Sequence, residues 1–273
     1  MEAAERGPEA KALEQLLEPL RRDRARAAIL TDVDGTVAPI VERPDDAAVP
    51  EASRELLRTL ARDYGLVACI SGRRALDARR VVGLDEVAYS GNHGFELLLP
   101  GDHEPRPDPS LDGHDRDARA FVAGVDQAEL ERVGIRTEDK GAIVALHWRG
   151  ADNEGEAESL ASEIAAEAEW NGLVAHRGRK VLEIRPNVAI NKGIAVAALI
   201  PARPVKTALY AGDDHTDLDA FAALRTLRED GELEATACIA IGSQEAPPEV
   251  AAAADLSVPG PDGFVAVLRA LAS

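Results

Sequence analysis

The sequence has few cysteines, no long apolar run and no apolar leader. Its 273 residues include two cysteines, Cys69 and Cys238, each in an apolar, strand-like stretch. We therefore expect two buried thiols rather than a disulfide or a redox pair. No window approaches the roughly 18 consecutive apolar residues of a membrane span, and the first 26 residues are charged throughout, unlike a signal peptide. These absences predict a cytoplasmic protein with no membrane partner.

Positive charge and aromatic side chains are also scarce. The chain has 31 Lys and Arg against 49 Asp and Glu, a net charge of −18, and 3% aromatic residues. A nucleic-acid-binding protein normally carries a basic face, so we expect no nucleic-acid partner. A site for an anionic substrate would need its own cation. The basic cluster "LRRDRAR" flanks a predicted amphipathic leader helix, whose apolar residues recur at helical spacing: Leu13, Leu16, Leu17 and Leu20.

Strand-like runs alternate with helical patterns at both ends of the chain. Apolar runs at 25–35, 64–72, 86–94, 207–214 and 235–242 predict strands. Patterns at 50–62, 75–82, 191–200, 248–254 and 262–271, and one from Thr216, predict helices. Alternation of this kind is typical of a parallel sheet with helices on both faces. We therefore expect an α/β fold whose core is a doubly wound, Rossmann-like sheet.

The middle of the chain differs from both ends. After a loop rich in Pro, Gly and Asp, it shows helical patterns at 116–131 and 153–170 and strand-like runs at 134–139, 142–149, 172–178 and 180–186. Two helices and four strands suffice for a small α+β domain. We therefore predict a core at 1–99 with the leader helix, an inserted domain at 100–186, and the second part of the core at 187–273.

Carboxylates gather where predicted strands end. Asp32 and Asp34 leave the first strand on the same side, because residues two apart in an extended chain share a face. Asp213 and Asp214 follow a later strand. The carboxyl ends of parallel strands meet at one edge of a sheet, and ligands bind there. Like charges so close repel unless a cation relieves them, so the sequence predicts a Mg²⁺ site.

Each of these carboxylates could instead belong to a calcium loop, a turn or a helix cap. An EF-hand loop starting at Asp32 would need Gly at its position 6 and Glu at position 12, where this chain has Val37 and Arg43, so an EF-hand is excluded. Asp-Gly after a strand also forms simple turns. An Asp of the later pair, or Thr216, could cap the following helix.

Two further motifs suit a phosphoryl group. In "CISGRR", Ser71, Gly72 and Arg73 lie where a strand gives way to a helix, so the hydroxyl and backbone N–H groups could bind a phosphate oxygen. Lys192 opens a later helix and could balance both a carboxylate and a transferring phosphoryl group. An ordinary Ser N-cap and a surface lysine are the alternatives. A carboxylate can attack phosphorus while a second acid protonates the leaving oxygen, roles that fit Asp32 and Asp34.

The ordered set "DVDGT", "SGR", "NKG" and "GDDHTD" resembles the four motifs of the haloacid-dehalogenase-like phosphohydrolases. Within that superfamily, "SGNHGFE", "EDKGAIVALHWR" and "RGRKVLEIRPNVAINKG" are similar to the trehalose-6-phosphate phosphatases, whose inserted domain is an α/β cap. The resemblance covers nearly the whole chain after residue 26. It implies a Mg²⁺-dependent phosphatase that acts on trehalose 6-phosphate through an aspartyl-phosphate.

The resemblance also implies residue roles. Asp32 would be the nucleophile and Asp34 the acid and base, while Ser71 and Lys192 bind the phosphoryl group. The metal would be held by Asp32, the backbone carbonyl of Asp34 and Asp213, with Asp214 and Asp217 in support. Substrate binding would fall on Gly72, Arg73, Asn92, His93, Lys140, His147, Arg149, Arg179 and Glu183.

The chain departs from the family pattern at two places in the cap. Arg179 stands where the family has a lysine, with Lys180 one place later, so either cation could serve the sugar. The usual "HYR" reads His147-Trp148-Arg149, which removes a phenol. His147 could also be a structural histidine in an apolar run.

Alternative roles and functions stay open as well. Glu183 could form an ion pair with Arg185 on its own strand, and His93 could have only a turn role. A related sugar phosphatase, acting on mannosyl-3-phosphoglycerate, sucrose-phosphate or a trehalose-like pseudosugar phosphate, is the nearest alternative. A phosphomutase or a non-catalytic binding module are more distant ones. We expect a small phosphorylated disaccharide as partner, and a monomer or small homo-oligomer.

Overall fold

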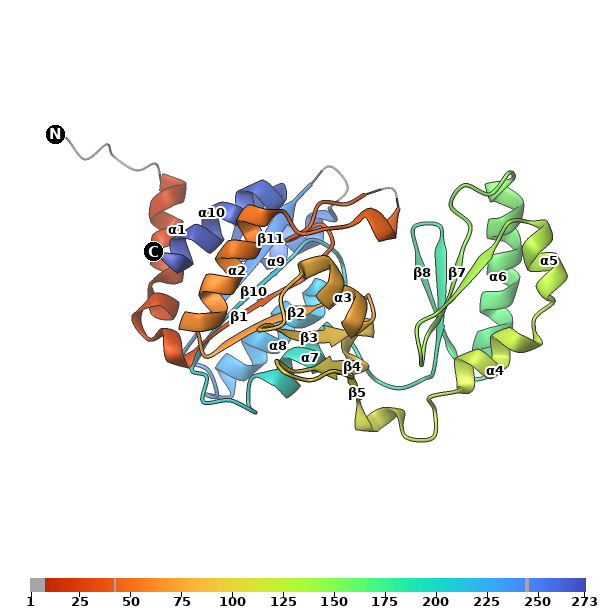
Figure 1. Cartoon of the computed structure of the whole chain (residues 1–273), viewed down its shortest axis with the longest axis horizontal. Helices are drawn as coiled ribbons and strands as arrows, with labels where there is room; N and C mark the ends of the chain where they lie inside the picture. Colours follow the sequence, from red (N-terminus) through yellow and green to blue (C-terminus); the bar gives the residue numbers. More distant parts are fainter. Residues whose placement is uncertain (1–7, 42, 244–245) are drawn as a thin grey trace. The chain divides into compact units, whose positions relative to one another are not determined.

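The computed structural model describes residues 8–41, 43–243 and 246–273, with side chains from residue 11 onward. The chain forms two compact units (Figure 1). The large unit comprises the described residues up to Arg106 together with Ile190–Ser273, and the small unit is Pro107–Ala189. The sequence prediction placed the insert at 100–186, slightly earlier at both ends.

An eight-stranded sheet forms the centre of the large unit, in the order β12-β11-β10-β1-β2-β3-β4-β5. The run from β12 to β3 is parallel, and β4 pairs antiparallel with β3. This arrangement confirms the predicted doubly wound core, although β4, β5 and β12 were not expected from the sequence. The strands are β1 (Ala27–Thr31), β2 (Leu66–Ile70), β3 (Ala88–Gly91), β4 (Glu96–Leu98), β5 (Arg106–Pro107), β10 (Thr207–Gly212), β11 (Ala235–Gly242) and β12 (Leu256–Pro259).

Helices cover both faces of this sheet because its central strands are apolar on both sides. Ile29 of β1 packs into one apolar cluster and Leu30 into the other. The first cluster includes side chains of α1 (Pro8–Arg22), α2 (Glu51–Asp63), α3 (Ala75–Val82) and α10 (Gly260–Ala272). The second includes side chains of α7 (Lys192–Leu199), α8 (Asp217–Glu229) and α9 (Pro248–Ala253). The predicted leader helix is α1, whose Leu17 and Leu20 are buried.

The small unit contains a four-stranded antiparallel sheet in the order β6-β7-β9-β8. One face packs on α6 through Val144, Leu146, Leu182 and Ile184. The other face carries polar side chains. The elements are α4 (Asp117–Gly124), α5 (Gln127–Arg132), β6 (Arg136–Asp139), β7 (Val144–His147), α6 (Glu154–Trp170), β8 (Val174–Gly178) and β9 (Val181–Arg185).

One sequence expectation for this unit was wrong. The single helix predicted over 116–131 is two helices, α4 and α5. The side chain of Asp126 accepts hydrogen bonds from the backbone N–H groups of Ala128 and Glu129, so it caps the start of a new helix. Short 3₁₀ turns occur at Arg24–Arg26, Pro44–Asp46, Asn92–Gly94 and Pro109–Leu111.

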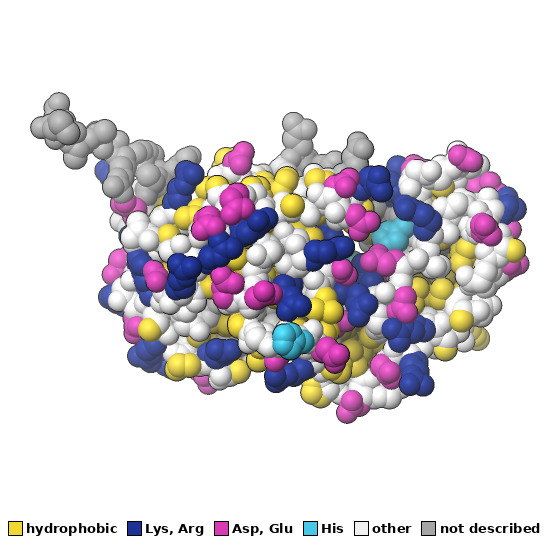
Figure 2. All heavy atoms as spheres, viewed as in Figure 1, with side chains coloured by type: hydrophobic (Ala, Val, Ile, Leu, Met, Phe, Trp, Pro, Cys, Tyr) yellow, Lys and Arg dark blue, Asp and Glu magenta, His cyan; other side chains and the backbone are white. Residues whose placement is uncertain are grey.

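The surface carries charges of both signs. On the face shown in Figure 2, acidic and basic side chains are interspersed over both units. Cys69 and Cys238 are buried free thiols, as the sequence predicted. Across the described residues, no helix combines the length and the apolar character needed to cross a membrane.

Candidate active site

Asp32 lies at the carboxyl end of the central strand β1. Its backbone N–H donates to the carbonyl of Ala211 on β10 at 2.8 Å, so the residue continues the register of the sheet. Its carboxylate is buried, and Lys192 Nζ donates to Oδ1 at 2.8 Å. Burial raises the pKa of Asp32 well above its usual range, and the Lys192 ammonium opposes that rise.

Lys192 is the first residue of α7 and is only 2% exposed. Asn191 caps this helix by accepting a hydrogen bond from the backbone N–H of Ile194 at 2.9 Å. The cap fixes the start of α7 and therefore the position of Lys192. Burial alone would lower the pKa of Lys192, but the carboxylates of Asp217 and Asp32 outweigh it and raise the pKa. The alternative of a solvated surface lysine is therefore wrong.

Asp217 lies at the start of α8 and receives four hydrogen bonds. Lys192 Nζ at 2.7 Å and Tyr210 Oη at 2.6 Å donate to Oδ1, and the backbone N–H groups of Asp213 and Asp214, at 2.9 and 3.0 Å, donate to Oδ2. A Cβ atom at Gly212 would lie 2.1 Å from Cγ of Asp217, so only glycine leaves room for this carboxylate. The four donors fill the ordinary acceptor capacity of one carboxylate.

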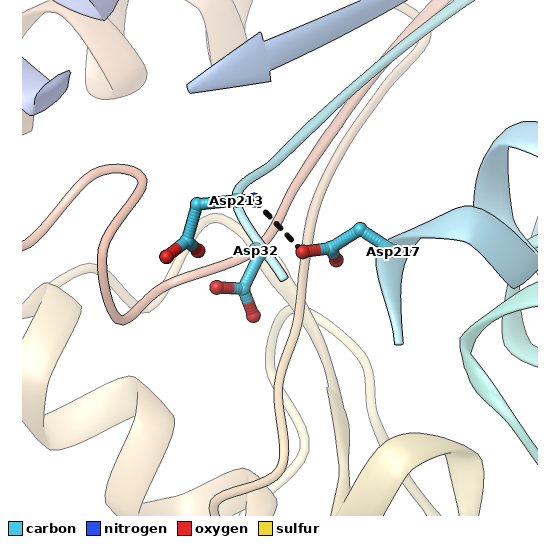
Figure 3. Close-up of side chains that lie close together, drawn as sticks. All are labelled: Asp32, Asp213 and Asp217. Carbon is cyan, nitrogen blue, oxygen red and sulfur yellow. Dashed lines mark hydrogen bonds between the residues drawn. The ribbon is translucent and has the colours of Figure 1, made fainter. Parts of the chain in front are cut away.

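Asp213 completes a group of three buried carboxylates. One oxygen from each of Asp32, Asp213 and Asp217 lies within 4.8 Å of the others. Figure 3 shows the three side chains close together. Thr36 Oγ1 donates to Oδ1 of Asp213 at 3.2 Å. Burial, then the negative charges of Asp217 and Asp214, raise the pKa of Asp213 to about 7. Gly35 has φ +86°, and a Cβ there would lie 2.1 Å from Oδ2 of Asp213, so a side chain at 35 would strain the backbone and displace the Asp213 carboxylate.

The donor set of this group fits a hard cation. Its ligands are all oxygen atoms, and clustered carboxylates require positive charge nearby. Because the lone pairs of Asp217 are committed to four donors, Asp32 and Asp213 are the two carboxylates with capacity for a metal ion. Asp217 instead orients the loop that carries Asp213.

The two other predicted carboxylates lie outside this group. Asp214 Oδ1 accepts from the backbone N–H and the hydroxyl of Thr216, at 2.8 and 2.6 Å, which are contacts within the loop before α8. Of the two capping alternatives, Thr216 is the N-cap residue of α8, but its side chain makes no capping hydrogen bond. Its Oδ1 is also 3.9 Å from Lys192 Nζ. The carboxylate of Asp34 contacts Arg73 rather than its neighbour Asp32: Arg73 Nε donates to Oδ2 at 2.7 Å and Nη2 to Oδ1 at 2.8 Å.

The loop after β2 lies at the same edge of the sheet. Ser71 is buried, and its Oγ accepts a hydrogen bond from the backbone N–H of Arg73 at 3.1 Å. The helix α3 begins later, after Arg74, and Ser71 is not its N-cap residue. The proposed N-cap alternative for Ser71 is therefore wrong. The predicted substrate role of Arg73 stays a prediction, since the structure places its guanidinium on Asp34.

A strained turn packs against this loop. Asn92 and His93 have φ values of 50° and 59°, which non-glycine residues seldom adopt. Their backbone N–H groups donate to the carbonyls of Arg73 and Ser71, at 2.7 and 2.9 Å. The ring of His93 lies over Gly72, where a Cβ would be 2.7 Å from the ring. The structure therefore brings Asn92, His93 and Gly72 to the edge of the sheet that holds Asp32.

The remaining predicted residues belong to the small unit. Lys140 Nζ donates to Oε1 of Glu183 at 2.8 Å, and both side chains are largely buried. His147 Nε2 lies 2.8 Å from Oε2 of Glu138. Because Glu138, Ala145, Glu183 and His176 are opposite one another in the strand register, they share the polar face of the sheet.

The two departures from the family pattern, at Arg179 with Lys180 and at Trp148, lie in the small unit. The ammonium of Lys180 contacts Glu154 at the start of α6, and Arg179 and Arg149 are exposed. Trp148 is buried in the apolar cluster of the small unit, which is a packing role. Binding of a sugar by these residues stays a prediction.

Sequence reasoning missed four residues that bond to, or lie opposite, the predicted site residues. Thr36 and Tyr210 bond to Asp213 and Asp217, Glu138 bonds to His147, and His176 lies opposite Glu183. Thr36 stood within the quoted "DVDGT" and Glu138 within "EDKG", so membership of a motif was the available signal. Tyr210 and His176 had no such signal beyond their place on a strand.

Comparison with known proteins gives the context of this geometry. The sequence model of the family described as "Trehalose-phosphatase" matches residues 30–259. The chain belongs to the trehalose-phosphatase family. An uncharacterized glycosyl hydrolase of Mycobacterium tuberculosis is 37% identical over 210 residues, which are 73% of this chain and 15% of that protein. The trehalose-phosphate phosphatase of Mycobacterium marinum is 34% identical over 228 residues, 78% of this chain and 55% of that protein.

A solved structure extends the likeness to the whole fold. The trehalose-6-phosphate phosphatase of Aspergillus fumigatus is 26% identical, with a TM-score of 0.64 over 95% of this chain and 97% of that chain. The chain spans about half of the length of the Mycobacterium marinum relative and much less of the Mycobacterium tuberculosis relative. The predicted resemblance to the trehalose-phosphatase family is confirmed.

Proposed function

We propose that this protein is a Mg²⁺-dependent phosphatase that hydrolyses trehalose 6-phosphate to trehalose and inorganic phosphate. The observation that carries the proposal is the buried contact of Asp32 with Lys192, beside Asp213, at the carboxyl ends of parallel strands. A buried carboxylate held by a lysine is placed to attack phosphorus. The choice of trehalose 6-phosphate as the substrate is supported by the match to the trehalose-phosphatase family and its relatives.

The reaction proceeds in two balanced half-steps. A carboxylate oxygen of Asp32 bonds to phosphorus as the bond from phosphorus to the sugar oxygen breaks, and Asp34 gives that oxygen its proton. The oxygen of a water molecule then bonds to phosphorus as the bond from phosphorus to Asp32 breaks, Asp34 takes a proton of the water, and phosphate leaves. Asp32 and Asp34 return to their starting states. Lys192 orients Asp32 through Oδ1 and balances charge on the phosphoryl oxygens.

Asp32 and Asp213 would hold Mg²⁺, together with the backbone carbonyl of Asp34. When bound, the ion supplies positive charge that offsets the carboxylates and the phosphoryl oxygens. Asp217 and Asp214 support the site from the second loop through the hydrogen bonds described above. A hard cation is favoured because the donors are oxygen atoms alone, and Mg²⁺ among hard cations because it is usually bound through one or two carboxylates together with substrate phosphate.

Ser71, Gly72 and the turn of Asn92 and His93 would contact the phosphoryl group or the sugar nearest to it. The polar face of the small unit would bind the sugar through Lys140, Glu183, His147, Arg149 and Arg179. What supports this assignment is the buried pair of Lys140 and Glu183 on a sheet face that carries other polar groups. The action of this unit as a cap, the cytoplasmic location and the oligomeric state stay predictions.

The test is phosphate release by the purified protein with Mg²⁺. The substrates are trehalose 6-phosphate, sucrose 6-phosphate, mannosyl-3-phosphoglycerate and glucose 6-phosphate. We expect a strong preference for trehalose 6-phosphate, abolished by EDTA and by Asp32→Asn. Turnover of only one of the other substrates would leave the proposed aspartyl-phosphate chemistry in place and change the proposed substrate. No turnover of any substrate by the unmodified protein would overturn the proposal.

A further inference from the structure

We propose that Arg73 is a positioning residue that sets the orientation of Asp34 for proton transfer. The proposal rests on the function proposed above, which makes Asp34 the acid and base. It assigns Arg73 to the carboxylate of this chain rather than to the substrate. It starts from the two hydrogen bonds that join the two side chains.

The contact between Arg73 and Asp34 is bidentate. Nε and Nη2 of one guanidinium donate to the two oxygens of one carboxylate, at 2.7 and 2.8 Å. Two parallel bonds of this kind fix the plane of the carboxylate as well as its position. The side chains are 17% and 36% exposed, so the pair is partly shielded from water. Without the guanidinium, the half-exposed carboxylate of Asp34 could rotate among several rotamers.

Arg73 is itself held from several directions. Its Nη1 donates to the carbonyl of Pro44 at 3.1 Å, which ties the guanidinium to the chain that follows Asp34. Its backbone N–H donates to Ser71 Oγ at 3.1 Å, and its carbonyl accepts from the N–H of Asn92 at 2.7 Å. The backbone anchors on one side and the Pro44 bond on the other make this guanidinium a fixed support. Lysine could not reproduce it, because an ammonium is a point charge without the planar fork.

The neighbouring contacts separate the two aspartates by role. Lys192 holds Asp32 within the buried group, and Arg73 holds Asp34 outside that group. Each aspartate of the "DVDGT" motif therefore has its own cation. A general acid must lie within hydrogen-bond reach of the oxygen that it protonates, and a displacement of about 1 Å can cost about 100-fold in rate. Orientation by Arg73 therefore affects the reaction only where proton transfer limits it.

The choice of leaving group isolates that effect. A sugar alkoxide is strongly basic and needs a proton as it leaves, whereas p-nitrophenolate leaves without one. The variants are Arg73→Ala and Arg73→Lys, with Asp34→Asn as reference. Arg80→Ala is the matched control, because Arg80 is an exposed arginine of α3 paired with Asp77 at 3.3 Å. The readouts are kcat and KM with trehalose 6-phosphate, and the first-turnover burst of p-nitrophenol from p-nitrophenyl phosphate.

We expect Arg73→Ala to lower kcat for trehalose 6-phosphate about 10- to 100-fold with little change in KM. The burst with p-nitrophenyl phosphate should keep nearly its full rate. Arg73→Lys should recover part of the loss, and Arg73→Ala should cost nothing further in the Asp34→Asn background, measured by the burst and by the slow sugar turnover. Thermal unfolding of each variant shows whether it is folded.

Three results would overturn the proposal. A raised KM with both substrates would make Arg73 a phosphate anchor. Equal loss of kcat with both substrates would mean a general structural effect. Unchanged or increased turnover of trehalose 6-phosphate in Arg73→Ala would mean that the contact between Arg73 and Asp34 does not contribute to the reaction.

Failure of the proposed function shows separately, since the unmodified protein would then not hydrolyse trehalose 6-phosphate. In that case the comparison uses the sugar phosphate that it does hydrolyse, and a protein that hydrolyses none overturns both proposals.

Discussion

Tyr210 and Asp217 are joined by a buried hydrogen bond of 2.6 Å between the phenol and Oδ1. Tyr210 lies on β10 and Asp217 opens α8, so the bond ties the strand to the helix that follows it. Burial, together with the nearby Asp217 charge, raises the pKa of Tyr210 well above its usual range, so the phenol keeps its proton and donates. The same Oδ1 accepts from Lys192, which in turn holds Asp32. The phenol thus supports the proposed nucleophile through two side chains.

Tyr210→Phe should therefore lower both stability and activity. The change removes one of four donors from a buried carboxylate, at a cost of about 1–2 kcal/mol in the free energy of unfolding. We expect phosphate release to fall as well, since Lys192 and Asp32 lose part of their support. Tyr89→Phe is the control: Tyr89 is also buried and donates to a backbone carbonyl, that of Leu84, at 2.6 Å. Similar stability loss with full activity in the control, measured by denaturant unfolding and turnover, would separate the two effects. Full activity in both variants would contradict the prediction.

Thr36→Val should weaken metal binding with little change in shape. The Thr36 hydroxyl donates to Asp213, and this bond lowers the pKa of that carboxyl against the larger effect of burial. Its loss leaves Asp213 protonated to higher pH, so Mg²⁺ competes less well near neutral pH. We expect the Mg²⁺ concentration for half-maximal activity to rise about 2- to 10-fold, an effect of about one hydrogen bond. Thr36→Ser should restore it. Thr59→Val, at a half-buried position of α2, should change nothing. An unchanged Mg²⁺ titration in Thr36→Val would refute this role.

The large unit was predictable because its signals are local and repeated. Buried strands such as β1 and β10 read as continuous apolar runs, and the helices between them show their own period. The strands β4 and β12 were missed because each is short, and residues of β12 alternate between half-buried and exposed. The split of the predicted helix at 116–131 depended on the two capping hydrogen bonds that the side chain of Asp126 accepts, which compete with an otherwise helical pattern.

The site was predictable to the level of its motifs. Asp32, Ser71 and Asp213 lie at one edge of the sheet because each follows a parallel strand that ends there, and Lys192 at the start of α7 contacts Asp32. The partners within the site were not predictable. An arginine after "SG" could bind a substrate phosphate or a carboxylate of the protein, and spacing along the sequence cannot choose between them. Arg73 and Asp34 are 39 residues apart, and their bidentate contact is supported by the hydrogen bond from Arg73 to the carbonyl of Pro44.

Lys140→Met tests the pair in the small unit. Glu183 is buried and bonded to Lys140, so removal of the ammonium leaves a largely buried carboxylate without that cation. We expect a loss of about 1–3 kcal/mol in stability. If this face binds sugar, KM for trehalose 6-phosphate should also rise, while KM for p-nitrophenyl phosphate should not. Arg119→Ala, which breaks an exposed pair with Asp139 in the same unit, is the control. A stability loss with unchanged KM for the sugar phosphate would make the pair structural alone.

The raised pKa of Asp213 predicts a specific dependence of stability on pH and Mg²⁺. Its ordinary value is 3.8 and its folded value about 7, so between these the folded protein holds a proton that the unfolded chain has lost. Without metal, the free energy of unfolding should therefore fall as pH rises from about 4 to about 7. Mg²⁺ needs the deprotonated carboxylate, so it should raise the melting temperature more at about pH 8 than at about pH 5.

Melting curves in EDTA and in Mg²⁺ at these two pH values measure both effects without reference to activity. Asp213→Asn is the comparison that isolates this carboxyl from the other titrating groups, because an amide neither titrates nor carries charge to a metal ion. We expect the variant to melt with a flatter pH dependence in EDTA and to gain little from Mg²⁺ at either pH. A variant that kept the full pH slope and the full Mg²⁺ gain would place both the proton and the metal ion elsewhere.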